Sequence, residues 1–139
     1  MHVATATFRW TPAYAVNIAV LDEQHRHLLE TMDALDQALR TGEGKSVLDP
    51  LLDRLVQYSQ EHFAEEEALM EKHNFPGLPT HRTQHQLFRA KIAEFMEKHK
   101  ANKAGVPVSL MFFLSDWLKT HLLKTDKQYS AFLNARGVH

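Results

Sequence analysis

Apolar residues recur at intervals of three and four positions in several long segments of this chain, and this spacing constrains the fold more than any other feature. In the first segment the spacing is carried by Leu21, Leu28, Met32 and Leu35, which fall on one side of a helix. Glycine and proline residues separate the segments, as expected at helix ends. The predicted helices span residues 19–41, 47–73, 80–100, 107–125 and 127–134.

Four long amphipathic helices joined by short loops predict an all-α fold, in the form of an antiparallel up-down-up-down four-helix bundle. The last predicted helix is a short C-terminal addition to this bundle. Residues 1–18 lack helical spacing, and we expect them to form a non-helical arm that packs on the bundle through its aromatic residues. Strand alternation and glycine-rich phosphate loops are absent from the sequence, and its length suits a single domain over residues 1–139.

Composition excludes several classes of chemistry and partner. The chain contains no cysteine, which excludes Cys-bound zinc, iron–sulfur clusters and thiol nucleophiles. Its net charge of −1 gives no strong field toward nucleic acid. The N-terminal sequence lacks a signal-peptide pattern, and no run of about 18 apolar residues occurs. A chain of this length needs no oligomer for stability, so we expect a monomer. From the charge and the N-terminal sequence we expect a cytoplasmic protein with no nucleic-acid and no membrane partner.

Ten histidines occur in the chain, and five of them fall on the predicted buried helix faces. A buried imidazole needs partners for both ring nitrogens, and a buried carboxylate must be paired or bound to a metal. One such histidine is usually satisfied by a hydrogen bond within the core, but five on facing helices indicate a shared site. The five are His25, His62, His81, His85 and His121.

Residue spacing indicates which side chains converge. His81 and His85 are four residues apart, so both can reach one ion from the same helix face. His62 and Glu66 repeat this spacing on the preceding helix, although Glu65, three residues from His62, shares the same face. Spacing therefore favours Glu66 only slightly, and an acidic run is also typical of a solvated helix edge.

The pair formed by His121 and Asp126 does not fit regular helical spacing. These residues are five apart, which separates them by about 140° on an α-helix. They converge only if the helix contains an i→i+5 π-turn or if Asp126 lies just beyond a break in the helix. Otherwise Asp126 is a surface acid or a helix cap.

Five imidazoles and two carboxylates form a donor set that suits iron, copper, nickel or zinc, and a carboxylate can bridge two ions. Two six-coordinate ions need twelve bonds, of which the histidines, two bridging carboxylates and a bridging oxide or hydroxide supply eleven. One position therefore stays open for a small ligand. The apolar wall around it is expected from Leu28, Leu29, Phe63, Trp117 and Leu118.

The order and spacing of these residues resemble the hemerythrin family in its single-domain bacterial form. The resemblance rests on His25, His62-x-x-x-Glu66, His81-x-x-x-His85 and His121-x-x-x-x-Asp126, and it extends over nearly the whole chain. It implies a non-haem di-iron centre, with two iron ions joined by an oxo or hydroxo bridge, inside a four-helix bundle. The implied function is reversible dioxygen binding for storage, delivery or sensing.

The resemblance also implies a role for each residue. No side chain has to act as an acid or a base, so ligand binding rather than catalysis is expected, and no catalytic residue is predicted. The implied metal ligands are His81, His85 and His121 on one iron, His25 and His62 on the iron with the open position, and the bridging carboxylates Glu66 and Asp126.

Other functions remain open at this point. A di-iron oxidase, a peroxidase or a nitric-oxide-reactive enzyme could use the same centre, although ferritin-like enzymes need Glu-x-x-His on two helices and this chain contains none. Zinc or manganese would also fit the ligands. A sensor would need an output domain, for which the chain has little room. A metal-free structural bundle would have to bury its polar groups unpaired, at a high cost in free energy.

Overall fold

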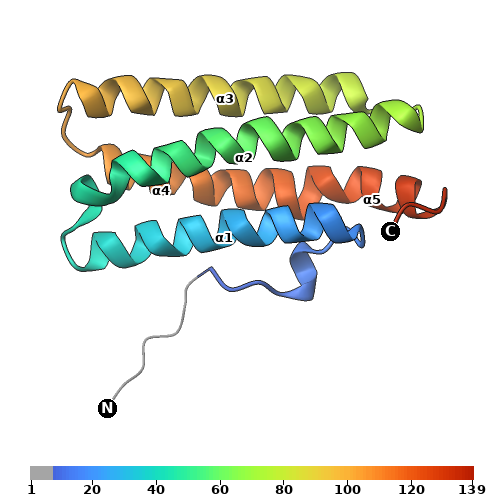
Figure 1. The fold of residues 1–139 in the computed structure, drawn as a ribbon, viewed down its shortest axis with the longest axis horizontal. Coiled ribbons are helices and arrows are strands. Elements are labelled where there is room, and N and C mark those ends of the chain that lie inside the picture. Colours follow the sequence, from blue (N-terminus) through green and yellow to red (C-terminus); the bar gives the residue numbers. More distant parts are fainter. Residues whose placement is uncertain (1–7) are drawn as a thin grey trace, which may run out of the picture.

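The computed structural model describes residues 8–139 and shows a bundle of four antiparallel rods (Figure 1). Helices α1, α2 and α3 each form one rod, and the fourth rod is built from three consecutive helical elements. The all-α four-helix bundle predicted from the sequence is thereby confirmed. The elements are the 3₁₀-helix η1 Pro12–Tyr14, α1 Ala19–Arg40, α2 Gly44–Lys72, α3 Leu78–Lys100, α4 Val106–Trp117, the π-helix η2 Leu118–Thr125 and α5 Asp126–Asn134.

The apolar core consists of two separate clusters of buried side chains. The larger cluster fills the bundle from the α1–α2 turn toward its middle and includes Leu35, Leu52, Phe88 and Leu114. The smaller cluster lies near the start of α1 and is made by Val16, Ile18, Leu21, Met70, Leu78, Tyr129 and Leu133. The histidines on the inner helix faces lie where the two clusters meet, so a polar layer has apolar side chains on both sides.

Helix α2 begins at Gly44, three residues before the expected start at 47. The carbonyl of Glu43 accepts hydrogen bonds from the backbone N–H groups of Ser46 and Val47, at 3.1 and 3.3 Å. A helical turn therefore forms before Pro50. Pro50 consequently lies inside the helix rather than in its first turn. Gly44 also permits a close approach to α4, because a Cβ atom there would lie 3.0 Å from the Cβ of Pro107.

The described part of the N-terminal arm is tied to the fourth rod and to α1. The backbone N–H of Val16 donates to Asp22 Oδ1 at 2.7 Å, and its carbonyl accepts a hydrogen bond from Ser130 Oγ at 2.8 Å. The guanidinium of Arg26 lies 4.8 Å from the ring centroid of Trp10. The remaining arm residues, 1–7, lie outside the described part of the chain.

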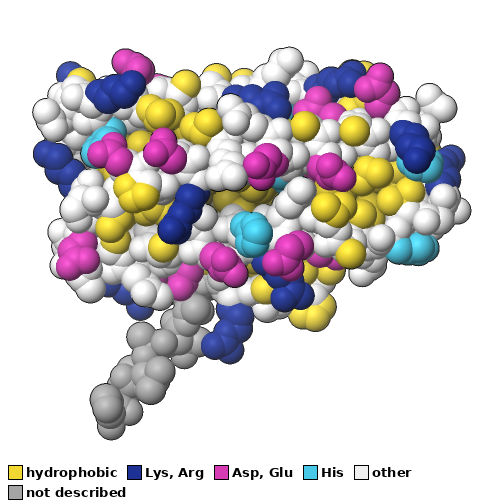
Figure 2. Space-filling view, in the orientation of Figure 1, with side chains coloured by type: hydrophobic (Ala, Val, Ile, Leu, Met, Phe, Trp, Pro, Cys, Tyr) yellow, Lys and Arg dark blue, Asp and Glu magenta, His cyan; other side chains and the backbone are white. Residues whose placement is uncertain are grey.

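Acidic and basic side chains are interspersed over the face drawn in Figure 2, in keeping with the small net charge of −1. Among residues 8–139, none of the helices combines the length and the hydropathy needed to span a lipid bilayer. The polar groups of most interest for function are those buried inside the bundle.

Candidate metal centre

All seven side chains that the sequence singled out are buried in the polar layer between the two apolar clusters. Their exposed fractions are between 0% and 2%. The donors come from five elements, which brings together residues that are up to about a hundred positions apart in the sequence. They are His25 on α1, His62 and Glu66 on α2, His81 and His85 on α3, His121 on the π-helix and Asp126 at the start of α5.

The donors form two groups that each have the size of a metal site. In either group, the nitrogen and oxygen atoms lie within 4.8 Å of one another. We call the group with three imidazoles the three-histidine cluster and the other the two-histidine cluster. The three-histidine cluster contains Glu66, His81, His85 and His121, and the two-histidine cluster contains His25, His62, Glu66 and Asp126.

Both carboxylates lie between the two clusters. Asp126 Oδ1 is 2.9 Å from His121 Nε2, whereas its Oδ2 is 3.2 Å from His25 Nε2. Glu66 Oε1 lies 2.8 Å from His62 Nε2 and 3.5 Å from His85 Nε2. Each carboxylate thus contacts imidazoles of both clusters, which is the position that a bridging ligand requires.

The donor atoms lack the hydrogen bonds that buried polar atoms normally make. The Nε2 atoms of all five histidines and all four oxygens of Glu66 and Asp126 have no hydrogen-bond partner among the described residues, although several of these atoms lie within 3.2 Å of each other. The contacts are short, but their geometry is not that of hydrogen bonds. Lone pairs that converge on common points without a proton donor fit metal ions, and the donor chemistry fits iron, copper, nickel or zinc.

The electrostatics of the polar layer follow from its burial and its charges. Burial opposes ionisation of Glu66 and Asp126, but the neighbouring imidazoles outweigh it and hold the pKa of each carboxyl below its usual range. Burial also opposes the charged form of His81, yet its contacts with Asp126 and Glu66 raise its pKa to about 9. Burial dominates at His62, whose pKa is lowered. Two buried carboxylates therefore stay ionised and attract cations, whether protons or metals.

The π-helix explains how His121 and Asp126 converge. The backbone N–H of Asp126 donates to the carbonyl of His121, which is an i→i+5 hydrogen bond, and it lies at the end of a π-helical segment that runs from Leu118 to Thr125. Of the two arrangements that the sequence left open, the structure therefore contains the π-turn. The wider turn brings the fifth residue back to the inner face of the rod.

Burial distinguishes Glu66 from Glu65, between which the residue spacing discriminated only slightly. Glu66 is fully buried within the polar layer, whereas Glu65 is exposed. His27, which is two residues from His25, faces solvent and contacts Glu23, and His99 contacts Asp49 outside the centre. These residues do not join either cluster.

Three donor histidines are oriented by side chains from a neighbouring helix, and sequence reasoning missed all three partners. The Nδ1 atom of His62 lies 2.6 Å from Gln24 Oε1, and that of His121 lies 2.7 Å from Gln84 Oε1. Because these oxygens only accept hydrogen bonds, Nδ1 carries the proton and Nε2 presents its lone pair to the centre. Each glutamine directly precedes a predicted ligand in the sequence, but serves a histidine on another helix.

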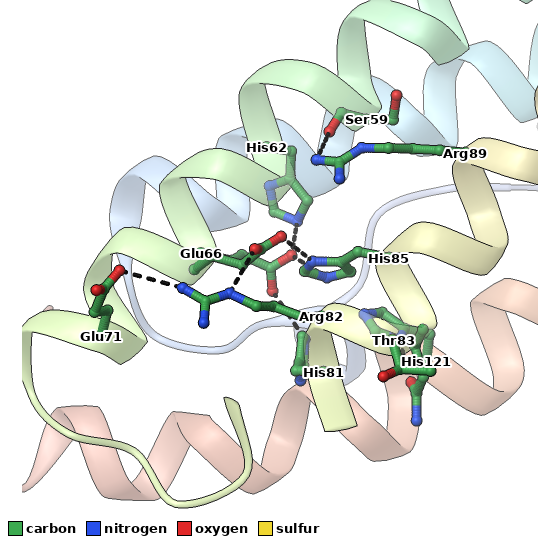
Figure 3. Close-up of polar contacts among 12 residues, drawn as sticks. Ser59, His62, Glu66, Glu71, His81, Arg82, Thr83, His85, Arg89 and His121 are labelled. Atoms are coloured by element: carbon green, nitrogen blue, oxygen red, sulfur yellow. Dashed lines mark hydrogen bonds and ion pairs between the residues drawn. The ribbon is translucent and has the colours of Figure 1, made fainter. Parts of the chain in front are cut away.

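The third partner is charged. Glu67 Oε2 lies 2.8 Å from His85 Nδ1, and Glu67 Oε1 accepts a hydrogen bond from Arg82 Nε at 3.1 Å. Figure 3 shows how Arg82 also reaches Glu71, so the guanidinium fixes the carboxylate that orients His85. The three-histidine cluster is thus supported by a negative charge, whereas Gln24, the neighbour of the two-histidine cluster, is neutral.

Aromatic rings cover the histidines on the side of the larger apolar cluster. Phe63 stacks on His85 with ring centroids 3.8 Å apart, and Trp117 stacks on His121 at 3.9 Å. Tyr58 stacks on His62 at 4.9 Å. Leu28, Leu29 and Leu118, which the sequence also placed around the centre, are buried as well.

Burial and the negative charges of Glu66 and Asp126 raise the pKa of Tyr58 well above 10. Its hydroxyl therefore keeps its proton. Tyr129, which lies 5.4 Å from His81 between ring centroids, is raised in the same way, because it too is buried beside Glu66 and Asp126.

Fold and site together define a class: a helical bundle that encloses two adjoining clusters of buried imidazoles and carboxylates, each of the size of a metal site. The family model "Hemerythrin HHE cation binding domain" matches residues 16–133, and the chain belongs to the hemerythrin family. It is 30% identical over 131 residues to the bacteriohemerythrin of Methylococcus capsulatus (strain Bath), covering 94% of this chain and 99% of that protein.

The chain is also similar to a further curated hemerythrin and to solved hemerythrin structures. The chain is 32% identical over 126 residues to a hemerythrin of Sipunculus nudus, covering 91% of this chain and 93% of that protein. A crystal structure of wild-type hemerythrin superposes with a TM-score of 0.81 at 30% identity, covering 92% of this chain and 98% of that chain. The resemblance seen in the sequence is thereby confirmed.

Proposed function

We propose that this protein binds two iron ions through His25, His62, Glu66, His81, His85, His121 and Asp126, and that the di-iron centre binds dioxygen reversibly. The observation that carries the proposal is the unequal number of imidazoles in the two clusters, three in one and two in the other, with both carboxylates in contact with imidazoles of each. With three imidazoles, one ion is coordinatively full, whereas the other has an open position. When bound, a pair of ferrous ions supplies the two electrons that reversible dioxygen binding requires.

The chain's own residues prepare this centre in three ways. Gln24, Gln84 and Glu67 fix the tautomers of three imidazoles, so that Nε2 is free to coordinate. Glu66 and Asp126 neutralise most of the charge of two divalent ions in an apolar interior. The rings stacked on His62, His85 and His121 exclude water from the side of the larger apolar cluster.

Anaerobic loading with ferrous iron tests the proposal. We expect two irons per chain and, on exposure to oxygen, a visible charge-transfer band that disappears when oxygen is removed and returns when it is readmitted. His81→Ala and His85→Ala should each lose at least one iron. A colourless protein that retains a single zinc after iron loading would contradict the proposal, as would unchanged metal content in both variants.

The same sample distinguishes a carrier from an enzyme. The relatives matched by sequence are hemerythrins, in keeping with a binding protein. We therefore expect oxygen uptake to stop at one molecule per centre when a reductant is supplied. Continuous consumption of reductant and oxygen would instead indicate an oxidase or a peroxidase.

A further inference from the structure

The hydroxyl of Tyr58 is a buried hydrogen-bond donor without an acceptor. Its side chain is 8% exposed, and the oxygen has no hydrogen-bond partner among the described residues. An unpaired buried hydroxyl lowers the stability of a protein, so such groups are rare unless another molecule supplies the missing acceptor. A phenylalanine would fill the same space without this cost.

The position of Tyr58 ties the hydroxyl to the two-histidine cluster. The ring stacks on His62 at 4.9 Å with an interplanar angle of 19°, and His62 in turn lies 4.5 Å from His25 between ring centroids. The two-histidine cluster has one imidazole fewer than the three-histidine cluster. Tyr58 therefore stacks on a histidine of the cluster to which the proposed function assigns the open position.

The other neighbours of Tyr58 offer its proton no acceptor. Phe63 and Phe88 pack edge-on against the ring, at 5.3 and 5.7 Å. Trp117 on α4 is close enough to interact with the hydroxyl, but its indole nitrogen is a donor and cannot accept the proton of Tyr58. These aromatic neighbours therefore leave the Tyr58 proton without an acceptor.

A solvent-accessible cavity borders Tyr58. A cavity of about 430 Å³ between α1 and α2 is lined by Tyr58 and His62, together with Gln24 and Thr31. Tyr58 thus contributes to the wall of this cavity, while its hydroxyl oxygen stays buried.

We propose that Tyr58 Oη donates a hydrogen bond to the small ligand held at the two-histidine cluster, which makes Tyr58 a determinant of ligand affinity. This inference rests on the proposed function. The ligand class is a small molecule with a terminal acceptor atom, dioxygen in the first place, and azide on the oxidised protein is a practical anionic probe. The Tyr58 hydroxyl then has a hydrogen-bond acceptor only when the ligand is bound.

Tyr58→Phe tests the inference with two readouts. The first is ligand binding to the iron-loaded protein: we expect two irons per chain, as in the wild type, but oxygen dissociation about three- to tenfold faster and azide binding weaker by a similar factor. The second is the melting temperature of the metal-free protein, which should be unchanged or higher, because the variant removes an unpaired buried polar group. Tyr14→Phe, which removes a hydroxyl from the arm, is the matched control.

Each outcome decides the question. Equal oxygen dissociation rates and equal azide affinities in Tyr58→Phe and wild type would overturn the inference while leaving the proposed function intact. A clearly lower melting temperature of the metal-free variant would also overturn it, because the hydroxyl would then have a structural partner. Wild-type protein that binds no oxygen would overturn the proposed function, and this inference with it.

Discussion

Protonation of His81 couples the stability of the metal-free protein to pH. The carboxylates beside it raise its folded-state pKa to about 9, whereas an unfolded histidine titrates near 6.5. A raised pKa means that the folded chain holds the proton more tightly, so this stabilisation is complete below pH 6.5 and is lost as the pH rises through 9. His25, whose pKa is also raised because Asp126 outweighs its burial, acts in the same direction.

The expected result is a melting temperature of the metal-free protein that falls between pH 6.5 and pH 9.5. His81→Gln should flatten this dependence, because the side chain no longer titrates. Thermal melts at several pH values in the presence of a chelator measure it. An equally steep decline in His81→Gln would show that other groups carry the effect.

Glu67 is the single charged group that backs a donor imidazole, among the three hydrogen-bonded pairs described above. Replacing it by glutamine keeps a hydrogen-bond acceptor next to His85 Nδ1 but removes the charge that makes the imidazole more basic. Glu67→Gln should therefore weaken metal binding at the three-histidine cluster by about ten- to a hundredfold, measured by competition with a chelator.

A matched control lies one helical turn further along α2. Glu71 contacts the same Arg82, at 3.2 Å, but is exposed and touches no histidine. Glu71→Gln makes the same change in charge and should leave metal affinity nearly unchanged. Equal weakening by both variants would mean that net charge, rather than the contact with His85, matters.

At the scale of elements, the π-helix accommodates one extra residue between His121 and Asp126, which are five positions apart rather than the four that suit an α-helix. Deleting Lys124, an exposed residue of this segment, should give a regular α-helix in which the aspartate follows His121 by four residues. Residues four apart lie on nearly the same face. We therefore expect the shortened protein to bind two metals per chain, as measured by metal analysis, with a circular dichroism spectrum of at least equal helical content.

A deletion in a regular helix should behave differently. Ala64 is exposed and lies between His62 and Glu66 on α2, so removing it rotates one part of the helix by about 100° relative to the other. The variant without Ala64 should lose both metals. If the variant without Lys124 lost its metals to the same extent, the π-helix would be needed for the site.

Sequence patterns predicted the helices better than their irregularities. The three-and-four spacing predicted the bundle, because the inner face of each helix follows directly from residue order. The spacing favoured Glu66 over Glu65 only slightly, since residues three and four positions away share a face, and packing against the other helices is what buries one of them. The π-turn likewise stayed one of two alternatives. Its i→i+5 hydrogen bond depends on how the fourth rod packs against the other three helices, and spacing within one segment does not contain this information.

The orienting residues could not be found from spacing at all. Gln24 directly precedes His25 in the sequence but hydrogen-bonds His62, and Gln84 directly precedes His85 but hydrogen-bonds His121. A neighbour in sequence is turned by about 100° on a helix, so it faces the adjacent rod rather than the centre. Which histidine it meets there depends on helix packing, which the pattern of one segment does not contain.

On the scale of the whole molecule, a layer of seven ionisable side chains divides the apolar core in two. Without metal, the layer holds buried charges that only partly compensate one another, and metal binding therefore contributes directly to folding. At free metal a thousandfold above the dissociation constant, linkage adds about 4 kcal/mol to the free energy of unfolding.

Removal of metal by a chelator should thus lower the melting temperature, by roughly 15 °C for a chain of this size. Scanning calorimetry of the loaded and metal-free protein measures the difference. His99→Ala, which changes a histidine paired with Asp49 outside the centre, should keep the full difference. Identical melting with and without metal would show that the polar layer is stable by itself.

The contact between His25 and Asp126, at 3.2 Å, joins the first long helix to the last one. During synthesis, His25 emerges from the ribosome about a hundred residues before the aspartate that it will face. A nascent chain that ends before Asp126 lacks one of the two carboxylates, so it cannot provide the complete set of donors. Under the proposed function, both metal ions can therefore take their final coordination only after the segment that contains Asp126 has been synthesised.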